Sequence, residues 1–268
     1  MKHPVFSLML SFLFLSFISC HKQSGEIKKQ NFDSDLGGIV RGDKNKKEIA
    51  LVFTGDAFAD GGTHIVSVLN QHKIQASFFF TGNFYSNPDF TDLIETLMSG
   101  KHYVGAHSDK HLLYCDWAKR DSLLVTKQEF IQDLNDNYLK MKSFGIEKKN
   151  AMYFLPAFEW YNDSISSWTK EAGLQLVNLT HGTLSHADYT TPEMKNYRSS
   201  DLIYNSILEY EKNDPSGLNG FILLAHIGTD PDRTDKFYYK LDSLIKTLKS
   251  KGYTFKRIDA LLAINLNE

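Results

Sequence analysis

The sequence predicts an α/β protein built as an irregular (β/α)7 barrel, and two observations support this fold class. Short apolar runs typical of buried strands alternate along the chain with stretches of helical periodicity, and seven such runs occur between residues 49 and 256. This alternation indicates a parallel sheet covered by helices. Seven strand units suit a barrel that is incompletely closed. A chain of 268 residues can form one such domain with a substantial core.

Each predicted element has its own signal in the sequence. The strands are runs of apolar residues at 49–53, 76–81, 103–106, 152–155, 175–179, 220–225 and 253–256. The helices between them are expected at 64–71, 90–98, 126–144, 164–171, 202–211 and 237–249. The longest begins with Thr126 followed by Glu129 three residues later, which is the capping-box pattern. It ends at Gly145, a residue type common just after helices.

The first 45 residues are predicted to lie outside the barrel. Residues 5–18 form an apolar run that is too short to span a bilayer as a helix, and Ser19-Cys20 follows it. This arrangement resembles a bacterial lipoprotein signal in which Cys20 carries the lipid; an ordinary secretory peptide or a short anchor is the alternative. Residues 21–45 are polar and are expected to be a flexible tether, which leaves 46–268 as the barrel domain. We therefore expect an exported, membrane-anchored lipoprotein, either periplasmic or at the cell surface.

Charge and cysteine content narrow the possible partners. The formal net charge is -2, so the composition gives no support for binding to nucleic acid or to an anionic membrane surface. The chain has two cysteines, and if Cys20 is lipidated only Cys115 remains, which excludes an intramolecular disulfide.

Polar, chemically versatile side chains follow the ends of four predicted strands. They are Asp56 and Asp60 after the first strand, His107 and His111 after the third, Glu159 after the fourth and His226 after the sixth. The carboxyl ends of parallel barrel strands meet at one rim, so these side chains are expected to share a site. His107 and His111 are four residues apart, which places both rings on one side of a helical turn. Two histidines with one carboxylate form a three-ligand metal site that keeps an open position for catalysis.

The order of these motifs resembles that of the polysaccharide deacetylases, carbohydrate esterase family 4, which have the NodB-homology fold. The resemblance covers roughly residues 47–260 and is most specific at His107-Ser108-Asp109-Lys110-His111. The other matching segments are residues 53–56, residues 154–158 with Tyr161-Asn162, and residues 224–226.

The resemblance implies that the protein hydrolyses N- or O-linked acetyl groups on a polysaccharide or oligosaccharide with one divalent metal ion. In the family the metal polarises the acetyl carbonyl and activates a water, an Asp is the general base, and a His protonates the leaving group. Carried over, His107, His111 and Asp56 are the expected metal ligands and His226 the acid. Zn²⁺ is the expected ion, with Co²⁺, Ni²⁺ and Mn²⁺ as alternatives.

Three positions depart from the family pattern. Thr54 and Gly55 occupy the nominal positions of the adjacent Asp pair, and Leu155 stands where the family has an Arg. The base must therefore be rebuilt or lost, and Asp60 and Glu159 are the candidate replacements. Phe158, Trp160 and Tyr161 are predicted to contact the sugar; for this aromatic run, packing in the core is the alternative.

Two other functions remain open from the sequence. Loss of the Asp pair and the Arg could leave a metal-containing lipoprotein that binds glycans without turnover. The same scaffold could also hydrolyse a different small amide or ester. A carboxylate near the metal ligands, beyond the ligand Asp56, would favour an enzyme over the binding protein.

Overall fold

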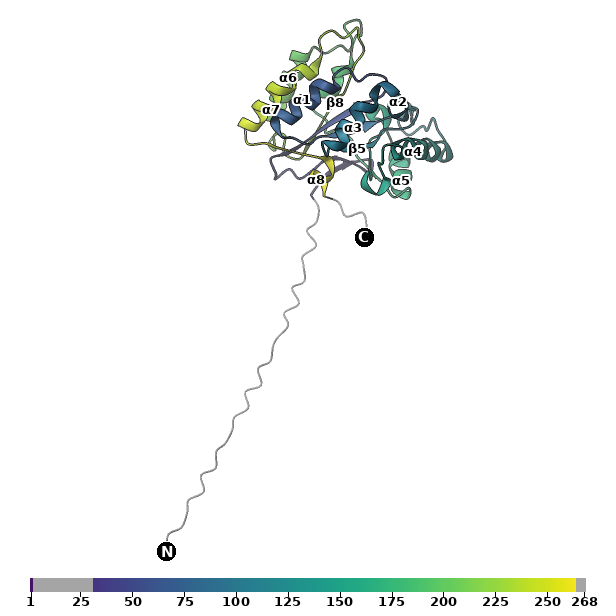
Figure 1. Ribbon diagram of the computed structural model, residues 1–268, viewed down its shortest axis with the longest axis horizontal. Coiled ribbons are helices and arrows are strands. Elements are labelled where there is room, and N and C mark those ends of the chain that lie inside the picture. Colours follow the sequence, from purple (N-terminus) through teal and green to yellow (C-terminus); the bar gives the residue numbers. More distant parts are fainter. Residues whose placement is uncertain (2–30, 264–268) are drawn as a thin grey trace.

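The computed structural model describes residues 1 and 31–263, which form a barrel of strands surrounded by helices (Figure 1). Nine strands belong to one sheet in this part of the chain. They are β1 (Asp33–Asp35), β2 (Gly38–Arg41), β3 (Glu48–Gly55), β4 (Ser77–Phe80), β5 (Tyr103–Ala106), β6 (Tyr153–Phe154), β7 (Gln175–Leu176), β8 (Phe221–His226) and β9 (Thr254–Lys256). The order is β1-β2-β8-β3-β4-β5-β6-β7, and β9 pairs with β3. All pairs from β8 through β3 to β7 are parallel, which confirms the predicted barrel class.

Eight α-helices and several short 3-10 segments connect the strands in the described part. The helices are α1 (Gly62–His72), α2 (Gly82–Ser86), α3 (Thr91–Ser99), α4 (Lys127–Lys142), α5 (Asp163–Glu171), α6 (Ser200–Asn213), α7 (Leu241–Ser250) and α8 (Ile258–Leu262). The 3-10 segments are η1 (Pro88–Phe90), η2 (Lys148–Asn150), η3 (Ala157–Glu159), η4 (Ser185–Tyr189) and η5 (Phe237–Lys240). The predicted capping box forms at Thr126 and Glu129 on α4. None of the helices described has the length and apolar character needed to cross a membrane.

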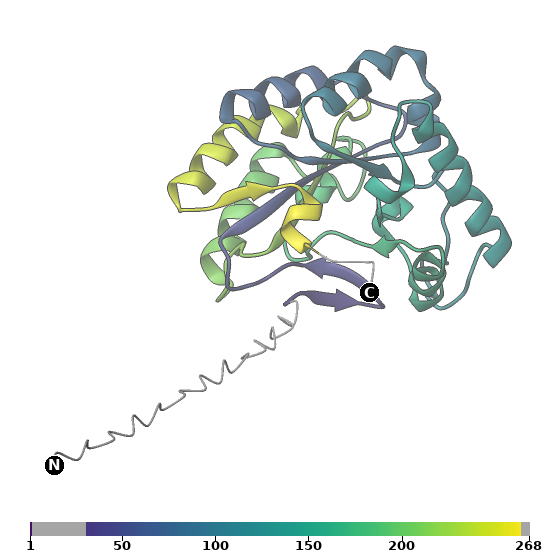
Figure 2. The same ribbon diagram turned by 60° about the horizontal axis from the view of Figure 1, so that its bottom comes forward.

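The hairpin of β1 and β2 corrects the predicted domain boundary. Figure 2 shows this hairpin (purple) along the lower edge of the barrel, near α8 (yellow). β2 pairs antiparallel with β8, and the Ile39 carbonyl accepts a hydrogen bond of 2.9 Å from the Asn178 N–H beyond β7. The strand therefore helps to close the gap between the first and last parts of the barrel. The prediction of a flexible tether is wrong from Asp33 onward, and the signal and anchor predicted for residues 1–20 fall almost entirely outside the described residues.

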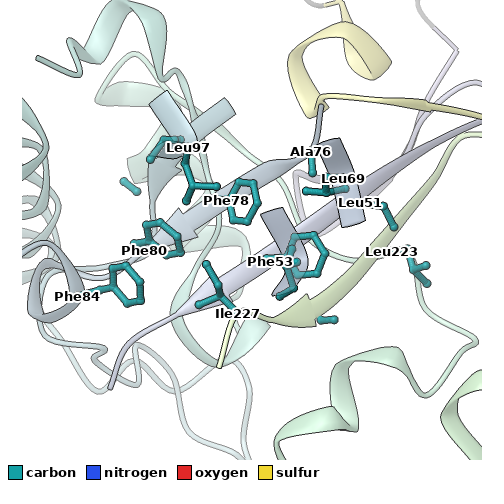
Figure 3. Close-up of a cluster of buried hydrophobic side chains, with 14 of the residues drawn as sticks. Leu51, Phe53, Leu69, Ala76, Phe78, Phe80, Phe84, Leu97, Leu223 and Ile227 are labelled. Atoms are coloured by element: carbon teal, nitrogen blue, oxygen red, sulfur yellow. The ribbon is translucent and has the colours of Figure 1, made fainter. Parts of the chain in front are cut away.

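The core has two layers, and their separation follows the alternation of side chains along each strand. On β3, Leu51 and Phe53 pack outward against the helices, in the cluster that Figure 3 shows. Ala50 and Val52 point inward, where α8 fills one end of the barrel together with residues of the other strands. Position 54 continues the inward series, so the alternation brings Thr54 to the end of the barrel at which the functional side chains were predicted.

A buried histidine directly before β5 makes folding stability depend on pH. His102 is 6% exposed, and its Nδ1 accepts the Ala76 N–H at 3.0 Å. Burial, aided by the nearby charge of Arg257, lowers the pKa of His102 from 6.5 to about 4. The folded state therefore prefers neutral His102, and its stabilisation is complete above pH 6.5 and is lost as the pH falls toward 4.

We expect the free energy of unfolding to fall by about 3 kcal/mol between pH 6.5 and 4 from this residue, at about 1.4 kcal/mol per pKa unit. Urea unfolding of the wild type and His102→Gln across this pH range would measure it, because the variant lacks the titrating imidazole. Parallel pH curves for the two proteins would contradict the assignment.

Candidate active site

A cavity of about 600 Å³ opens at the carboxyl ends of the strands. Its lining includes five of the side chains predicted from the sequence: Asp56, His107, His111, Glu159 and His226. The predicted aromatic residues Phe158 and Trp160 also line it. Strands that are far apart in the sequence thus bring these groups to a single site, at the rim where barrel enzymes carry their chemistry.

His107 is held as a neutral imidazole with one nitrogen free. It follows β5, is 2% exposed, and its Nδ1–H donates to the Leu155 carbonyl at 2.9 Å. Burial, reinforced by the neighbouring His111, lowers the pKa of His107 well below its ordinary value. The contact with the carbonyl fixes the tautomer, so the lone pair lies on Nε2. A neutral histidine anchored through its second nitrogen is the usual form of a metal ligand.

The loop from His107 to His111 has an unfavourable backbone geometry that a buried carboxylate supports. Ser108 (φ 75°) and His111 (φ 54°) lie in the left-handed region, which non-glycine residues adopt at a cost. Asp133 of α4 is 5% exposed and accepts four hydrogen bonds from this region. The donors are Ser108 Oγ (2.8 Å), the Asp109 N–H (3.1 Å), the Lys110 N–H (2.9 Å) and Tyr114 Oη (2.8 Å).

One turn further along α4, Asn137 continues this support. Its side-chain oxygen accepts the His107 N–H at 3.0 Å, and its side-chain nitrogen donates to the Phe80 carbonyl. The sequence analysis missed both Asp133 and Asn137. The available signal was a pair of polar residues four apart on an otherwise core-facing stripe of the helix.

Replacing Asp133 by asparagine should lower metal affinity about 10–100-fold, the usual effect of losing a group that orients metal ligands. The amide has one acceptor oxygen in place of two, so it cannot satisfy the four donors. Cobalt titration followed by absorbance would measure the affinity. Asp136→Asn, on the same helix with its carboxylate bonded to Gln132, is the matched control. Equal affinity in Asp133→Asn and the wild type would contradict the role.

Asp56 is oriented by two side chains at the start of α2. Its Oδ1 accepts from Thr81 Oγ1 at 2.7 Å and from Asn83 Nδ2 at 3.1 Å. Gly55 beside it cannot be replaced by an aspartate without rearrangement. A Cβ on Gly55 would lie 2.8 Å from Ile227 Cγ2 and 2.9 Å from Phe84 Cε2. The packing of Ile227 and Phe84 around position 55 therefore leaves no room for the second aspartate of the pair in this chain.

The three candidate ligands have the chemistry of a metal site, but their side chains are not close enough together in this structure to hold an ion. Among the described residues, no three His, Cys, Asp or Glu side chains lie close enough to hold a metal as they stand. Asp56, His107 and His111 nevertheless line the same cavity, and burial lowers the pKa of His111 although the negative charge of Asp56 opposes it. Two neutral imidazoles and a carboxylate are a donor set that suits a divalent ion.

Glu159 enters the cavity from a strained turn after β6. Phe158 (φ 59°) and Glu159 (φ 53°) are both left-handed, and the Glu159 carbonyl is held by Asn178 Nδ2 at 2.7 Å. The carboxylate is 15% exposed, and its Oε1 lies 4.0 Å from His107 Nε2. Burial raises the pKa of Glu159 to about 7. A carboxylate with this pKa can take up and release a proton near neutral pH.

His226, at the end of β8, forms a dyad with a residue that the sequence analysis missed. Its Nδ1 lies 2.6 Å from Asp188 Oδ1, and its backbone N–H donates to Asp188 Oδ2 at 2.9 Å. Burial alone would lower the pKa of His226, but the charge and hydrogen bond of Asp188 outweigh it and raise the pKa. Asp188 lies in η4, in a region that gave no motif. Its distance of 38 residues from His226 hid the pairing.

A buried arginine holds the segment that carries Asp188. Arg233 is fully buried and donates to the Thr190 carbonyl at 2.5 Å and to the Arg198 carbonyl at 3.0 Å. These bonds connect the chain after β8 to the segment after η4, so both partners of the dyad are fixed.

Two predicted site residues are corrected by the structure. The Asp60 carboxylate pairs with Lys236 Nζ at 2.9 Å and accepts from Tyr238 Oη and the Thr229 N–H, and Asp60 is not part of the cavity lining. Asp60 therefore connects two loops, and its predicted role as base is wrong. Tyr161 is fully buried, and its hydroxyl donates to the Asp35 carbonyl at 2.8 Å. Its predicted sugar contact is also wrong, because the ring packs in the core.

Comparison with known proteins identifies the family. Residues 41–177, just over half of the chain, match the sequence profile of the polysaccharide deacetylases. The chain belongs to the polysaccharide deacetylase family. This match confirms the predicted family and, with it, a hydrolase acting on acetyl amide or ester bonds. His226 lies beyond the matched range, so its assignment depends on the geometry described above.

Curated relatives agree with this family, and a solved structure has a similar fold. A peptidoglycan-N-acetylglucosamine deacetylase of Bacillus cereus is 28% identical over 81% of this chain and 89% of its own length. A peptidoglycan-N-acetylmuramic acid deacetylase of Bacillus subtilis is 26% identical over 81% of this chain and 73% of its own. In fold, the chain is similar to a pseudoenzyme of carbohydrate esterase family 4 from Bacillus anthracis, with a TM-score of 0.64, 18% identity, and coverage of 86% and 70% of the two chains.

Proposed function

We propose that the protein is a metal-dependent deacetylase of a polysaccharide or oligosaccharide in which Glu159 has taken over the work of the missing aspartate. The observation that carries the proposal is the position of Glu159, 4.0 Å from the free nitrogen of His107 in a cavity that also contains His226. Family membership supports the reaction class, and two curated relatives are named for removing acetyl groups from peptidoglycan sugars.

In this proposal Glu159 accepts the proton of the attacking water, which its raised pKa allows near neutral pH. Asp188 on Nδ1 favours the protonated form of His226, and in that form its Nε2–H is the group that donates to the leaving nitrogen or oxygen. Asp188 keeps the ring in this orientation. The acid and the base are thus distinct residues whose pKa values both lie above those of the free side chains.

The metal of the proposal would be held by Asp56, His107 and His111, with Zn²⁺ preferred for this donor set and Co²⁺, Ni²⁺ or Mn²⁺ as substitutes. When bound, such an ion supplies Lewis acidity toward the acetyl oxygen and makes a water more acidic. Leu155, Thr81 and Asn83 orient two of the ligands through hydrogen bonds.

The test is acetate release from acetylated oligosaccharides by the protein stripped of metal and reloaded with Zn²⁺ or Co²⁺, beside His107→Ala and His111→Ala. Release that requires the metal and both histidines would support the proposal. No release, with one equivalent of metal bound, would contradict it and favour the glycan-binding protein. The nearness of Glu159 favours the enzyme, and a cavity of about 600 Å³ favours a glycan over a very small amide.

We further propose export with a lipid anchor at Cys20, on the basis of the apolar run at residues 5–18 and the serine-cysteine that follows it. Labelling of the expressed protein with a lipid analogue, with Cys20→Ala as control, tests this. Equal labelling of both proteins would contradict the anchor.

A further inference from the structure

A large aromatic side chain that the sequence analysis did not single out stands at the mouth of the cavity. Trp117 lies in the connection between His111 and α4, lines the cavity, and is 56% exposed. His107, which lines the same cavity, is 2% exposed. The cavity therefore extends from the buried histidines out to an indole ring that faces solvent.

Trp117 is exposed but firmly held. Its ring lies 5.4 Å from the ring of Trp160 at an interplanar angle of 31°, and the Phe158 ring meets it edge-on at 5.7 Å. Trp160 Nε1 donates to the carbonyl of Asp116, and the Asp116 carboxylate accepts the N–H of Ala118 and of Lys119. The backbone on both sides of Trp117 is thus fixed by hydrogen bonds.

Trp160 is already engaged as part of this support. The Arg120 guanidinium lies 4.3 Å from the centre of its ring, and Arg120 Nε donates to the Tyr161 carbonyl. Arg120 and Trp117 both pack on the Trp160 ring, so Trp160 supports Trp117 by packing. Of these two tryptophans, Trp117 is the more exposed and leaves ring area for a ligand.

The chemistry around this ring suits a partner that has apolar faces and no negative charge. No Lys or Arg belongs to the cavity lining among the described residues, whereas the exposed rings of Phe58 and Tyr189 and the side chain of Met194 do. Exposed apolar groups collected at one opening indicate a binding site. A sugar ring presents C–H groups on its faces and can lie flat on an indole, and a ring fixed beforehand binds at little entropic cost.

We propose that Trp117 is the platform for a second sugar ring, next to the ring that carries the acetyl group, so that the site selects a glycan chain over a single acetylated sugar. This inference rests on the proposed deacetylase function. A cavity of about 600 Å³ that reaches from His107 to Trp117 has room for more than one acetyl group and its sugar.

The experiment compares a β-1,4-linked N-acetylglucosamine tetramer with the N-acetylglucosamine monomer as substrates. The proteins are the wild type, Trp117→Ala, Trp117→Phe and the control Leu124→Ala, which removes another side chain of the same connection, 53% exposed and outside the cavity lining. We expect the wild type to prefer the tetramer. Trp117→Ala should raise KM for the tetramer about tenfold, the size of one lost stacking contact, with kcat unchanged. Trp117→Phe should retain most of the affinity, and values for the monomer should not change.

Other results would overturn the platform. These are an unchanged KM in Trp117→Ala, an equal loss on monomer and tetramer, or a wild type without preference for the tetramer. Calorimetric binding of the tetramer to the metal-loaded proteins separates this inference from the proposed function. If no protein releases acetate, the proposed function fails. Binding that is about tenfold weaker in Trp117→Ala than in Leu124→Ala would then still support the platform, and equal or absent binding would overturn it.

Discussion

Replacing Glu159 by glutamine is expected to lower kcat for acetate release about 10²–10⁴-fold, the usual contribution of a positioned general base. Glutamine preserves the size of the side chain and the strained turn at Phe158 and Glu159, but it cannot take up a proton. Metal affinity should change little, because the proposed ligands are Asp56, His107 and His111. Initial rates of acetate release with the metal-loaded variant would measure the effect.

Asp60→Asn is the informative partner experiment, because Asp60 is the other carboxylate that the sequence offered as a base. Its carboxylate is engaged by Lys236, Tyr238 and Thr229, so the variant should lose some stability and keep its chemistry. A large loss of kcat in Asp60→Asn together with a nearly normal Glu159→Gln would reverse the two assignments.

The contrast between these two carboxylates shows what a sequence without structure can specify. The strand and helix pattern placed the barrel correctly, because buried strands and amphipathic helices leave strong periodic signals. The same pattern correctly predicted that five side chains share one rim of the barrel, because the carboxyl ends of parallel strands meet there. These side chains are Asp56, His107, His111, Glu159 and His226. It could not separate Glu159 from Asp60, since the partners of each carboxylate come from distant segments.

The hairpin at residues 33–41 and the supporting residues were hidden for related reasons. Its two strands are three and four residues long, too short for a periodic signal, and β2 pairs with β8, more than 170 residues away in the chain. Asp133 resembles any polar residue on a helix until its four hydrogen bonds to the loop after β5 are seen. Trp117 gives no periodic signal, because its position depends on contact with Trp160.

Asp188→Asn is expected to lower kcat about 10²–10³-fold, within the usual range for disabling a general acid. The two oxygens of Asp188 accept from Nδ1 and from the backbone N–H of His226, and an asparagine has an oxygen for one of them. Loss of the negative charge also removes the largest of the interactions that raise the pKa of His226. The histidine then loses its proton at lower pH than in the wild type.

The pH dependence distinguishes this role from a general loss of structure. Activity that requires protonated His226 should decline toward high pH, and in Asp188→Asn that decline should begin at a lower pH than in the wild type. The pH profile of kcat for both proteins measures the shift. Asp230→Asn is the matched control, because Asp230 lines the same cavity while its carboxylate is bonded to the Asp232 N–H. A profile reduced in height but unshifted in Asp188→Asn would mean that Asp188 supports the fold without tuning the acid.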